Sequence, residues 1–287
     1  MTESNPQARV LVITDLSAEG DVALKAAAQE AAASGAELCV VHAVPDVSSI
    51  RSLFPQRLAE ESVLAAELPG HAEHALRARL AALNVDAAKV ALAIERGTTV
   101  EGALQAIDRW QPTLVVIGAA DGAVDAVRLV RHLACPLLVA RSGPDTRVVV
   151  AGTDLSDPSR PAVRAAAEEC ARLDGELVVA HAIEVHPLFV YGVALPAMFN
   201  PMSPGEIHEA AQQRLDQAVR EAGAKGRTTI RVGPPSAALL ELARDEQARL
   251  LVVATHGRTG LTRFVLGSVA ENVIRQAPCS VLVVRAA

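Results

Sequence analysis

Residues 250–285 read LLVVATHGRTGLTRFVLGSVAENVIRQAPCSVLVVR, and the predicted fold of the whole chain follows from this stretch. It opens with a β-branched run that has the length of a buried strand and is broken by a glycine-containing loop. Apolar residues then recur at helical spacing until Pro278, which ends the helix before a second buried strand, 280–284. The pattern predicts a strand, a loop, a helix and a strand in that order.

Gly267 and Ser268 stand at the predicted start of this helix. Ser268 is a typical N-cap residue, and Gly267 leaves room for a close backbone approach. Free amides and the helix dipole favour an anion at such a position, and Arg258 and Arg263 could add positive charge. The residues therefore allow a phosphate-binding loop, or else a tight turn in which the glycines only satisfy backbone geometry.

The stretch as a whole resembles the C-terminal half of the universal stress protein family. Nucleotide-binding members carry a glycine, two residues, a second glycine, nine residues and then Gly-Ser or Gly-Thr. Gly257, Gly267 and Ser268 match this spacing, whereas Ala254 stands in place of the first glycine. The resemblance implies that the second half of the chain binds ATP, with or without Mg²⁺, as part of a regulatory or stress-response role.

Length and composition restrict the class of protein. The chain has 287 residues, 51% of them hydrophobic and 21% charged, which indicates two folded domains of ordinary size. A net charge of −6 without a basic tract argues against a nucleic-acid partner. No apolar run has membrane-spanning length, no signal peptide is visible, and the four cysteines are scattered, so we expect a cytoplasmic protein without disulfides or a zinc site.

One unit is written twice in the sequence. The segment VLVITDLS, residues 10–17, returns as VVVAGTDLS, residues 148–156, and His42 returns as His181 at the same spacing. A near-constant offset of this kind indicates tandem duplication. We predict a first domain over residues 1–143 and a second over residues 146–287. The two histidines end strands and are predicted to be hydrogen-bonded structural groups.

Each unit alternates strands with amphipathic segments, which is typical of a parallel sheet with helices on both faces. The resemblance supplies the strand order 3-2-1-4-5. The predicted fold class is therefore α/β, with two tandem, doubly wound, five-stranded parallel sheets of flavodoxin-like or Rossmann-like layering. Locally, Thr98 and Glu101 predict a capping box, and Ser236 is predicted to cap a later helix.

In this strand order the first and fourth strands are neighbours, and a ligand crevice should open above their carboxyl ends. In the family the acid after the first strand contacts the nucleoside or a phosphate-bound metal, and Asp154 occupies that position. Read without the resemblance, Asp154 could be only a turn residue. The resemblance implies the following nucleotide contacts, with no catalytic residue and no protein metal site: Thr153, Asp154, Leu155, Ala182, Ala254, Thr255, His256, Gly257, Arg258, Gly260, Gly267, Ser268 and Val269.

The first unit lacks the phosphate loop. After its fourth strand it reads GAADGAVDAVRLVRHLACPLLVAR, which is shorter and has no counterpart of Gly267 and Ser268. Asp121 and Asp125 put negative charge where phosphates would lie, and Coulomb repulsion opposes a polyphosphate there. The first unit is therefore predicted to be a degenerate copy that serves as a structural partner.

Two other functions remain open from the sequence. Residues 184–205 form a long apolar connection with three aromatic residues, which covers a site, covers a partner surface, or packs on its own domain. The chain could thus be a module that binds a protein or an apolar ligand through this loop. It could also be a slow phosphotransferase or ATPase that uses Asp154 and a divalent metal. No general base is evident, so we expect ligand-dependent regulation of an unknown protein partner and not turnover.

The fifth strand of each unit, at 137–141 and 281–285, is apolar and is predicted to lie at a sheet edge. Exposed edges of this kind are covered or paired in proteins. Single-domain members of the family dimerise through this strand, so the resemblance implies an intramolecular pseudo-dimer of the two units. Further homodimerisation through residues 184–205 is a weaker expectation.

We expect residues 146–287, expressed alone, to self-associate or aggregate, because the partner for their fifth strand is missing. Sedimentation velocity over a range of concentrations measures this. A stable, soluble monomer of the fragment at high concentration would contradict the pseudo-dimer.

Overall fold

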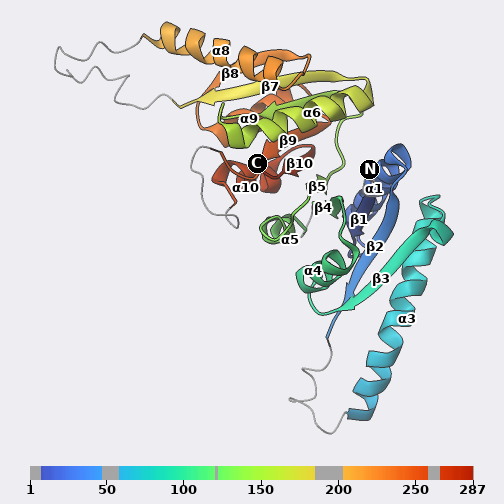
Figure 1. Cartoon of the computed structure of the whole chain (residues 1–287). Coiled ribbons are helices and arrows are strands. Elements are labelled where there is room, and N and C mark those ends of the chain that lie inside the picture. Colours follow the sequence, from blue (N-terminus) through green and yellow to red (C-terminus); the bar gives the residue numbers. More distant parts are fainter. Residues whose placement is uncertain (1–7, 47–57, 120–121, 185–202, 258–265, 287) are drawn as a thin grey trace, which may run out of the picture. The chain divides into compact units, whose positions relative to one another are not determined.

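The computed structural model describes residues 8–46, 58–119, 122–184, 203–257 and 266–286 (Figure 1). The chain divides into two compact units, Met1–Ser142 and Gly143–Ala287. Within these described ranges each unit contains five strands with helices between them.

Unit 1 holds a parallel sheet in the strand order β3-β2-β1-β4-β5. Helices α3 and α4 both contact β2 and β3 (Figure 1). The elements of unit 1 are β1 (Arg9–Ile13), α1 (Ala18–Ser34), β2 (Glu37–Val44), α3 (Leu58–Ala82), the 3₁₀ turn η2 (Ala87–Lys89), β3 (Val90–Arg96), α4 (Thr99–Trp110), β4 (Leu114–Gly118), α5 (Gly122–Leu129) and β5 (Leu137–Ala140).

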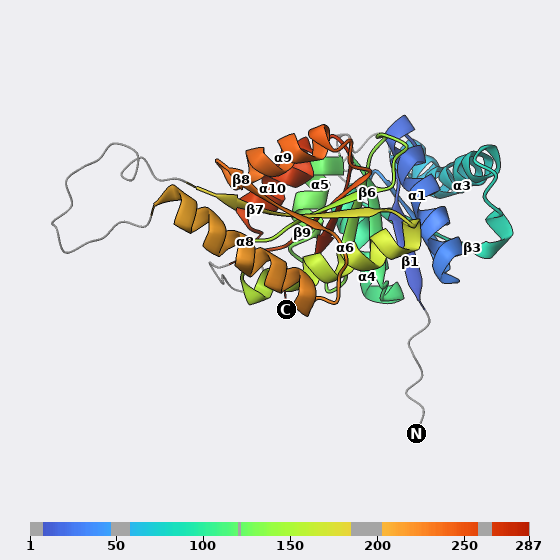
Figure 2. The ribbon, with the colours of Figure 1, turned by 90° about the horizontal axis from the view of Figure 1, so that it is seen from above.

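Unit 2 repeats this arrangement in the order β8-β7-β6-β9-β10, again with parallel pairs. Figure 2 shows α9 and α10 on one face of its strands and α6 and α8 on the other. The elements of unit 2 are β6 (Val148–Gly152), the 3₁₀ turn η3 (Asp157–Ser159), α6 (Arg160–Leu173), β7 (Glu176–Ile183), α8 (Pro204–Glu221), β8 (Arg227–Val232), α9 (Pro235–Asp245), β9 (Leu250–Ala254), α10 (Ser268–Gln276) and β10 (Ser280–Val284).

The predicted α/β class and the order 3-2-1-4-5 within each unit are confirmed. The ten strands of the described residues are not divided into two sheets. The prediction of two five-stranded sheets is therefore not confirmed. The prediction rested on the sequence boundary between the repeats, and strand patterns alone do not specify where one sheet ends.

The central strands are buried because helices cover both of their faces. Leu11, Val12, Val149 and Leu251 are fully shielded from solvent. Such strands read as continuous Val, Ile and Leu runs, which is the pattern expected for parallel sheets with two covered faces. This explains why strand positions could be predicted from short apolar runs: β4 and β9 begin at Leu114 and Leu250, as expected.

The duplication is also visible in the backbone, where left-handed residues recur at the same places in both units. The pairs, with their φ angles, are Leu16 (65°) and Leu155 (64°), Gly35 (66°) and Asp174 (48°), Asn84 (57°) and Gly223 (67°), Gly97 (118°) and Gly233 (129°), and Gln111 (49°) and Gln247 (46°). Several of these positions end helices, where Gly, Asn and Asp tolerate a positive φ. The conformation has therefore persisted in both units although two of the five pairs differ in residue type.

Two local predictions have different outcomes. The capping box of α4 is confirmed, because the Thr98 side chain accepts from the Glu101 N–H and the Glu101 side chain accepts from the Thr98 N–H. The predicted cap at Ser236 is wrong, because α9 already begins at Pro235 and its N-cap is Pro234. Proline is favoured in the first helical turn, and that preference places the start before the serine.

We expect Thr98→Ala to lower the free energy of unfolding by about 1 kcal/mol, because the Thr98 hydroxyl no longer accepts from the Glu101 N–H or donates to the Glu101 carboxylate. Ser236→Ala is the matched control and should change it by less than about 0.5 kcal/mol, because Ser236 caps no helix. Urea unfolding followed by circular dichroism measures both. Equal losses in the two variants would contradict the cap assignment.

Candidate functional site

The first strand of unit 2 ends in a turn that its own side chains hold. The Thr153 hydroxyl accepts a hydrogen bond from the Leu155 N–H at 3.1 Å, and Oδ1 of Asp154 accepts one from the Ser156 N–H at 3.1 Å. Local bonds of this type let a polar side chain stand in for a backbone turn. They accompany the left-handed conformation of Leu155 and fix the position of Asp154 at the carboxyl end of β6.

A histidine on the neighbouring strand holds the same turn. Nδ1 of His181 lies 2.9 Å from the Thr153 carbonyl oxygen, and Nδ1 of His42 lies 2.8 Å from the Thr14 carbonyl oxygen in unit 1. A carbonyl oxygen only accepts, so each ring donates from Nδ1. The prediction that these histidines are hydrogen-bonded structural groups is confirmed.

Asp154 contacts the loop that follows β9. A Cβ atom added at Gly257 would lie 1.9 Å from Oδ2 of Asp154 and 2.7 Å from its Cγ. The carboxylate therefore lies directly against the Gly257 backbone, and only glycine leaves it that space. Two motifs that are far apart in the sequence come together at the carboxyl ends of β6 and β9, which are paired strands.

The start of α10 is tied to the end of β9. The Gly267 N–H donates to the Thr255 carbonyl at 2.7 Å, and Thr255 is buried and accepts from the Ala286 N–H through its hydroxyl. Gly267 is the N-cap of the helix. The expectation that Ser268 is the cap is therefore wrong: Ser268 is the exposed first helical residue, and the N-cap glycine before it has no side chain to bond this end.

The remaining predicted contacts are placed as follows. Ala182 lies near the carboxyl end of β7, and Val269 lies in the first turn of α10; both are half-buried. Nδ1 of His256 is shielded from solvent and has no hydrogen-bond partner within the described part of the chain. Arg258, Gly260 and Arg263 fall outside the described residues, as do residues 185–202 of the apolar connection.

Unit 1 carries the same turn but different surroundings. Leu16 N–H donates to the Thr14 hydroxyl at 3.1 Å, and Ser17 N–H donates to Asp15 at 2.9 Å. Burial alone would raise the pKa of Asp15, but hydrogen bonds from Ser17 outweigh it and hold the pKa below its usual value. Asp15 thus accepts a hydrogen bond within its own turn, as Asp154 does in unit 2.

The fourth strand of unit 1 leaves no space beside this turn. A Cβ atom at Gly118 would lie 2.7 Å from the Glu19 carbonyl oxygen, whereas unit 2 carries a real Cβ at Ala254. Helix α5 begins at Gly122, soon after β4. Asp125 pairs with Arg128 at 3.9 Å, and Asp121 lies outside the described residues. The end of β4 thus packs closely against α1 beside the Asp15 turn.

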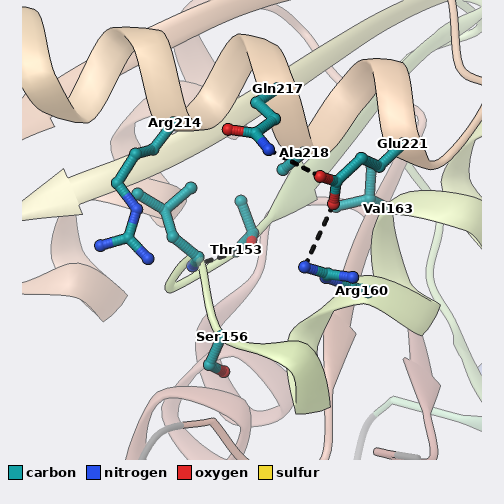
Figure 3. A pocket seen from close by; sticks show the side chains of 9 residues that line it. Thr153, Ser156, Arg160, Val163, Arg214, Gln217, Ala218 and Glu221 are labelled. Carbon is teal, nitrogen blue, oxygen red and sulfur yellow. Dashed lines mark hydrogen bonds and ion pairs between the residues drawn. The ribbon is translucent and has the colours of Figure 1, made fainter.

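Sequence reasoning missed a cavity on the α6 and α8 face of unit 2 (Figure 3). Its volume is about 90 Å³, and it shares Thr153 and Leu155 with the predicted nucleotide contacts. The other polar lining groups come from Ser156, Arg160 on α6, and Arg214, Gln217 and Glu221 on α8. The sequence held one signal for it: when the two repeats are aligned, Arg79 on α3 corresponds to the much smaller Ala218 on α8.

The four cysteines are free thiols, as predicted. Burial raises the pKa of Cys39 and of Cys135 to about 11, so both are protonated at neutral pH and unreactive. Among the described residues, no group of three or more His, Cys, Asp and Glu side chains is placed to hold a metal ion. In the same part of the chain, no helix combines the length and apolar character needed to cross a membrane.

Comparison with known proteins agrees with this fold. The model of the universal stress protein family matches residues 8–141 and 146–285. A universal stress protein of Mycobacterium bovis is 29% identical, and the match covers 99% of this chain and 99% of that one.

Two solved structures are also similar. A universal stress protein from Archaeoglobus fulgidus is 18% identical with a TM-score of 0.64, covering 97% of this chain and 99% of that one. A universal stress protein in complex with cAMP is 31% identical with a TM-score of 0.37, covering 51% of this chain and 100% of that one. Because the family model matches both halves, the chain belongs to the universal stress protein family and carries one domain of that family in each unit.

Proposed function

We propose that unit 2 binds one adenine nucleotide, ATP with or without Mg²⁺, between the turn after β6 and the start of α10. The observation that carries this proposal is the contact of the Asp154 carboxylate with Gly257, because it brings the strand-end acid and the glycine loop into one site. The bound nucleotide would change how a regulatory, stress-response protein interacts with its partner, a protein of unknown identity in the cytoplasm.

The groups at the turn after β6 and at the start of α10 suit a nucleotide chemically. Ser156 holds Oδ1 of Asp154 in place, and a carboxylate is a group that can accept from ribose hydroxyls or bind a phosphate-bound cation. The first turn of α10 offers backbone N–H groups and the positive end of a helix dipole to a phosphate. The tie between Gly267 and Thr255 fixes where those groups lie relative to the acid.

The same arrangement supports binding more than turnover. A general base must be free to take a proton from an attacking water. Oδ1 of Asp154 accepts from both the N–H and the hydroxyl of Ser156, so this acid is built to accept hydrogen bonds in a fixed direction. We therefore propose a role in which nucleotide occupancy, and not catalysis, is the signal.

We expect one ATP per chain in calorimetric titration, because the turn acid of unit 2 is joined by Gly257 and by the helix start at Gly267 and Ser268, which has no counterpart in the sequence of unit 1. Asp154→Asn should weaken binding about tenfold or more, since a charged acceptor is lost. Asp15→Asn is the matched control in the equivalent turn of unit 1 and should leave the affinity unchanged. Two equivalent sites, or an equal loss in both variants, would contradict the assignment to unit 2.

We expect Gly257→Ala to weaken ATP binding because the new methyl group would occupy the space of the Asp154 carboxylate. Gly205→Ala on α8 is the control, since a Cβ there meets nothing closer than the Ser203 hydroxyl at 3.8 Å. A double-mutant cycle isolates the contact: in an Asp154→Ala background, Gly257→Ala should have little further effect. Additive losses would show that Gly257 acts independently of Asp154.

A further inference from the structure

The two units differ in what packs against the outer side of the strand-end turn. In unit 1, Arg79 on α3 reaches this turn and fills the space beside it. Its Nη2 donates to the Leu16 carbonyl at 3.0 Å, and its Nε donates to Asp21 on α1 at 2.6 Å. The Arg79 guanidinium thus provides hydrogen-bond donors for both the Leu16 carbonyl and the Asp21 carboxylate. This part of unit 1 is therefore complete without a ligand.

In unit 2 the position of Arg79 is taken by Ala218 on α8. The equivalence rests on the buried residues of the two helices: Leu76 and Leu80 of α3 correspond to Leu215 and Val219 of α8 at the same offset that relates the two turns. At this offset Arg160 stands in the place of Asp21. The guanidinium is absent, and the cavity of about 90 Å³ lies where it would be, bordered by Leu155 and Ala218.

Most polar groups around this cavity already have partners. Arg160 pairs with Asp157 at 3.0 Å and with Glu221 at 3.1 Å, and the Gln217 amide donates to Glu221 at 2.8 Å. The charge of Glu221 is thereby offset. Figure 3 shows Arg214 and Arg160 on opposite sides of Thr153.

Arg214 differs from these groups, because it forms no ion pair or hydrogen bond with any other residue that the structure describes. A guanidinium carries five N–H donors in a planar fork that matches a carboxylate or a phosphate. Arg214 is an exposed residue at the edge of the cavity, so its donors face solvent and are available to an anion that binds there.

We propose that this cavity is a second binding site of unit 2, for a single anionic group, the carboxylate or phosphate of a small metabolite. Arg214 is its principal ligand, and Ser156 and Gln217 border the bound group. At about 90 Å³ the cavity is well below the roughly 300–1,000 Å³ of pockets that hold whole ligands, so we take it to hold one such group and not a whole nucleotide. The site is independent of the proposed nucleotide crevice, although both use the turn after β6.

The test is a titration of the full-length, isotope-labelled chain with inorganic phosphate and, separately, with acetate, followed by NMR at constant ionic strength. The amides of Leu155, Ser156 and Gln217 should shift. Arg214→Gln should weaken this response about tenfold or more, since a charge-assisted hydrogen bond is lost. Arg220→Gln, an exposed arginine of the same helix that does not line the cavity, is the matched control and should leave it unchanged.

A second variant rebuilds the arrangement of unit 1. Arg160→Asp combined with Ala218→Arg recreates the pair that Asp21 and Arg79 form, so it should fold and abolish the response of the Gln217 amide. Shifts confined to Ser268 would assign the anion to the start of α10 and overturn the proposal. So would an unchanged affinity in Arg214→Gln, or no response of the cavity amides to either anion.

Discussion

The hydrogen bond from the Leu155 N–H to the Thr153 hydroxyl is the constraint on which the site depends. It accompanies a leucine with φ 64°, a left-handed conformation that costs a non-glycine residue about 1 kcal/mol or more. The imidazole of His181 and the acid that follows Thr153 supply further bonds that offset this strain. Because the turn is held on several sides, the Asp154 carboxylate has a fixed direction before any ligand arrives.

The same turn exists in both units, so the difference between them lies in what surrounds it. In unit 1 a backbone carbonyl packs against Gly118, and the Arg79 guanidinium lies on the turn carbonyl. In unit 2 the corresponding places hold the methyl groups of Ala254 and Ala218. The prediction that unit 1 binds no nucleotide is supported by this filled space as well as by the missing counterpart of Gly267 and Ser268.

Much of the fold could be predicted because it depends on local pattern. Buried apolar runs located the strands, and a Thr-x-x-Glu pattern located the start of α4. The starts of α9 and α10 could not be located in this way. Gly267 caps α10 in place of Ser268 because its N–H bonds to the Thr255 carbonyl, a contact across the sheet end that no local window contains. The cavity was missed for the same reason, since it appears only when α6 and α8 are placed on one face.

The two units differ mainly in the helix residues beside the strand-end turn, and this difference suggests how one copy of a duplicated fold can acquire a binding site. The strands and the left-handed positions have stayed the same, because altering them would disturb every neighbour in a close-packed interior. Substitutions on the helices alter what reaches the strand-end turn without altering the turn itself. Replacement of one long arginine by Ala218 removes a partner from a backbone carbonyl and leaves a polar opening. A rigid turn bordered by exchangeable helix residues can therefore gain or lose a ligand while the sheet beneath it remains unchanged.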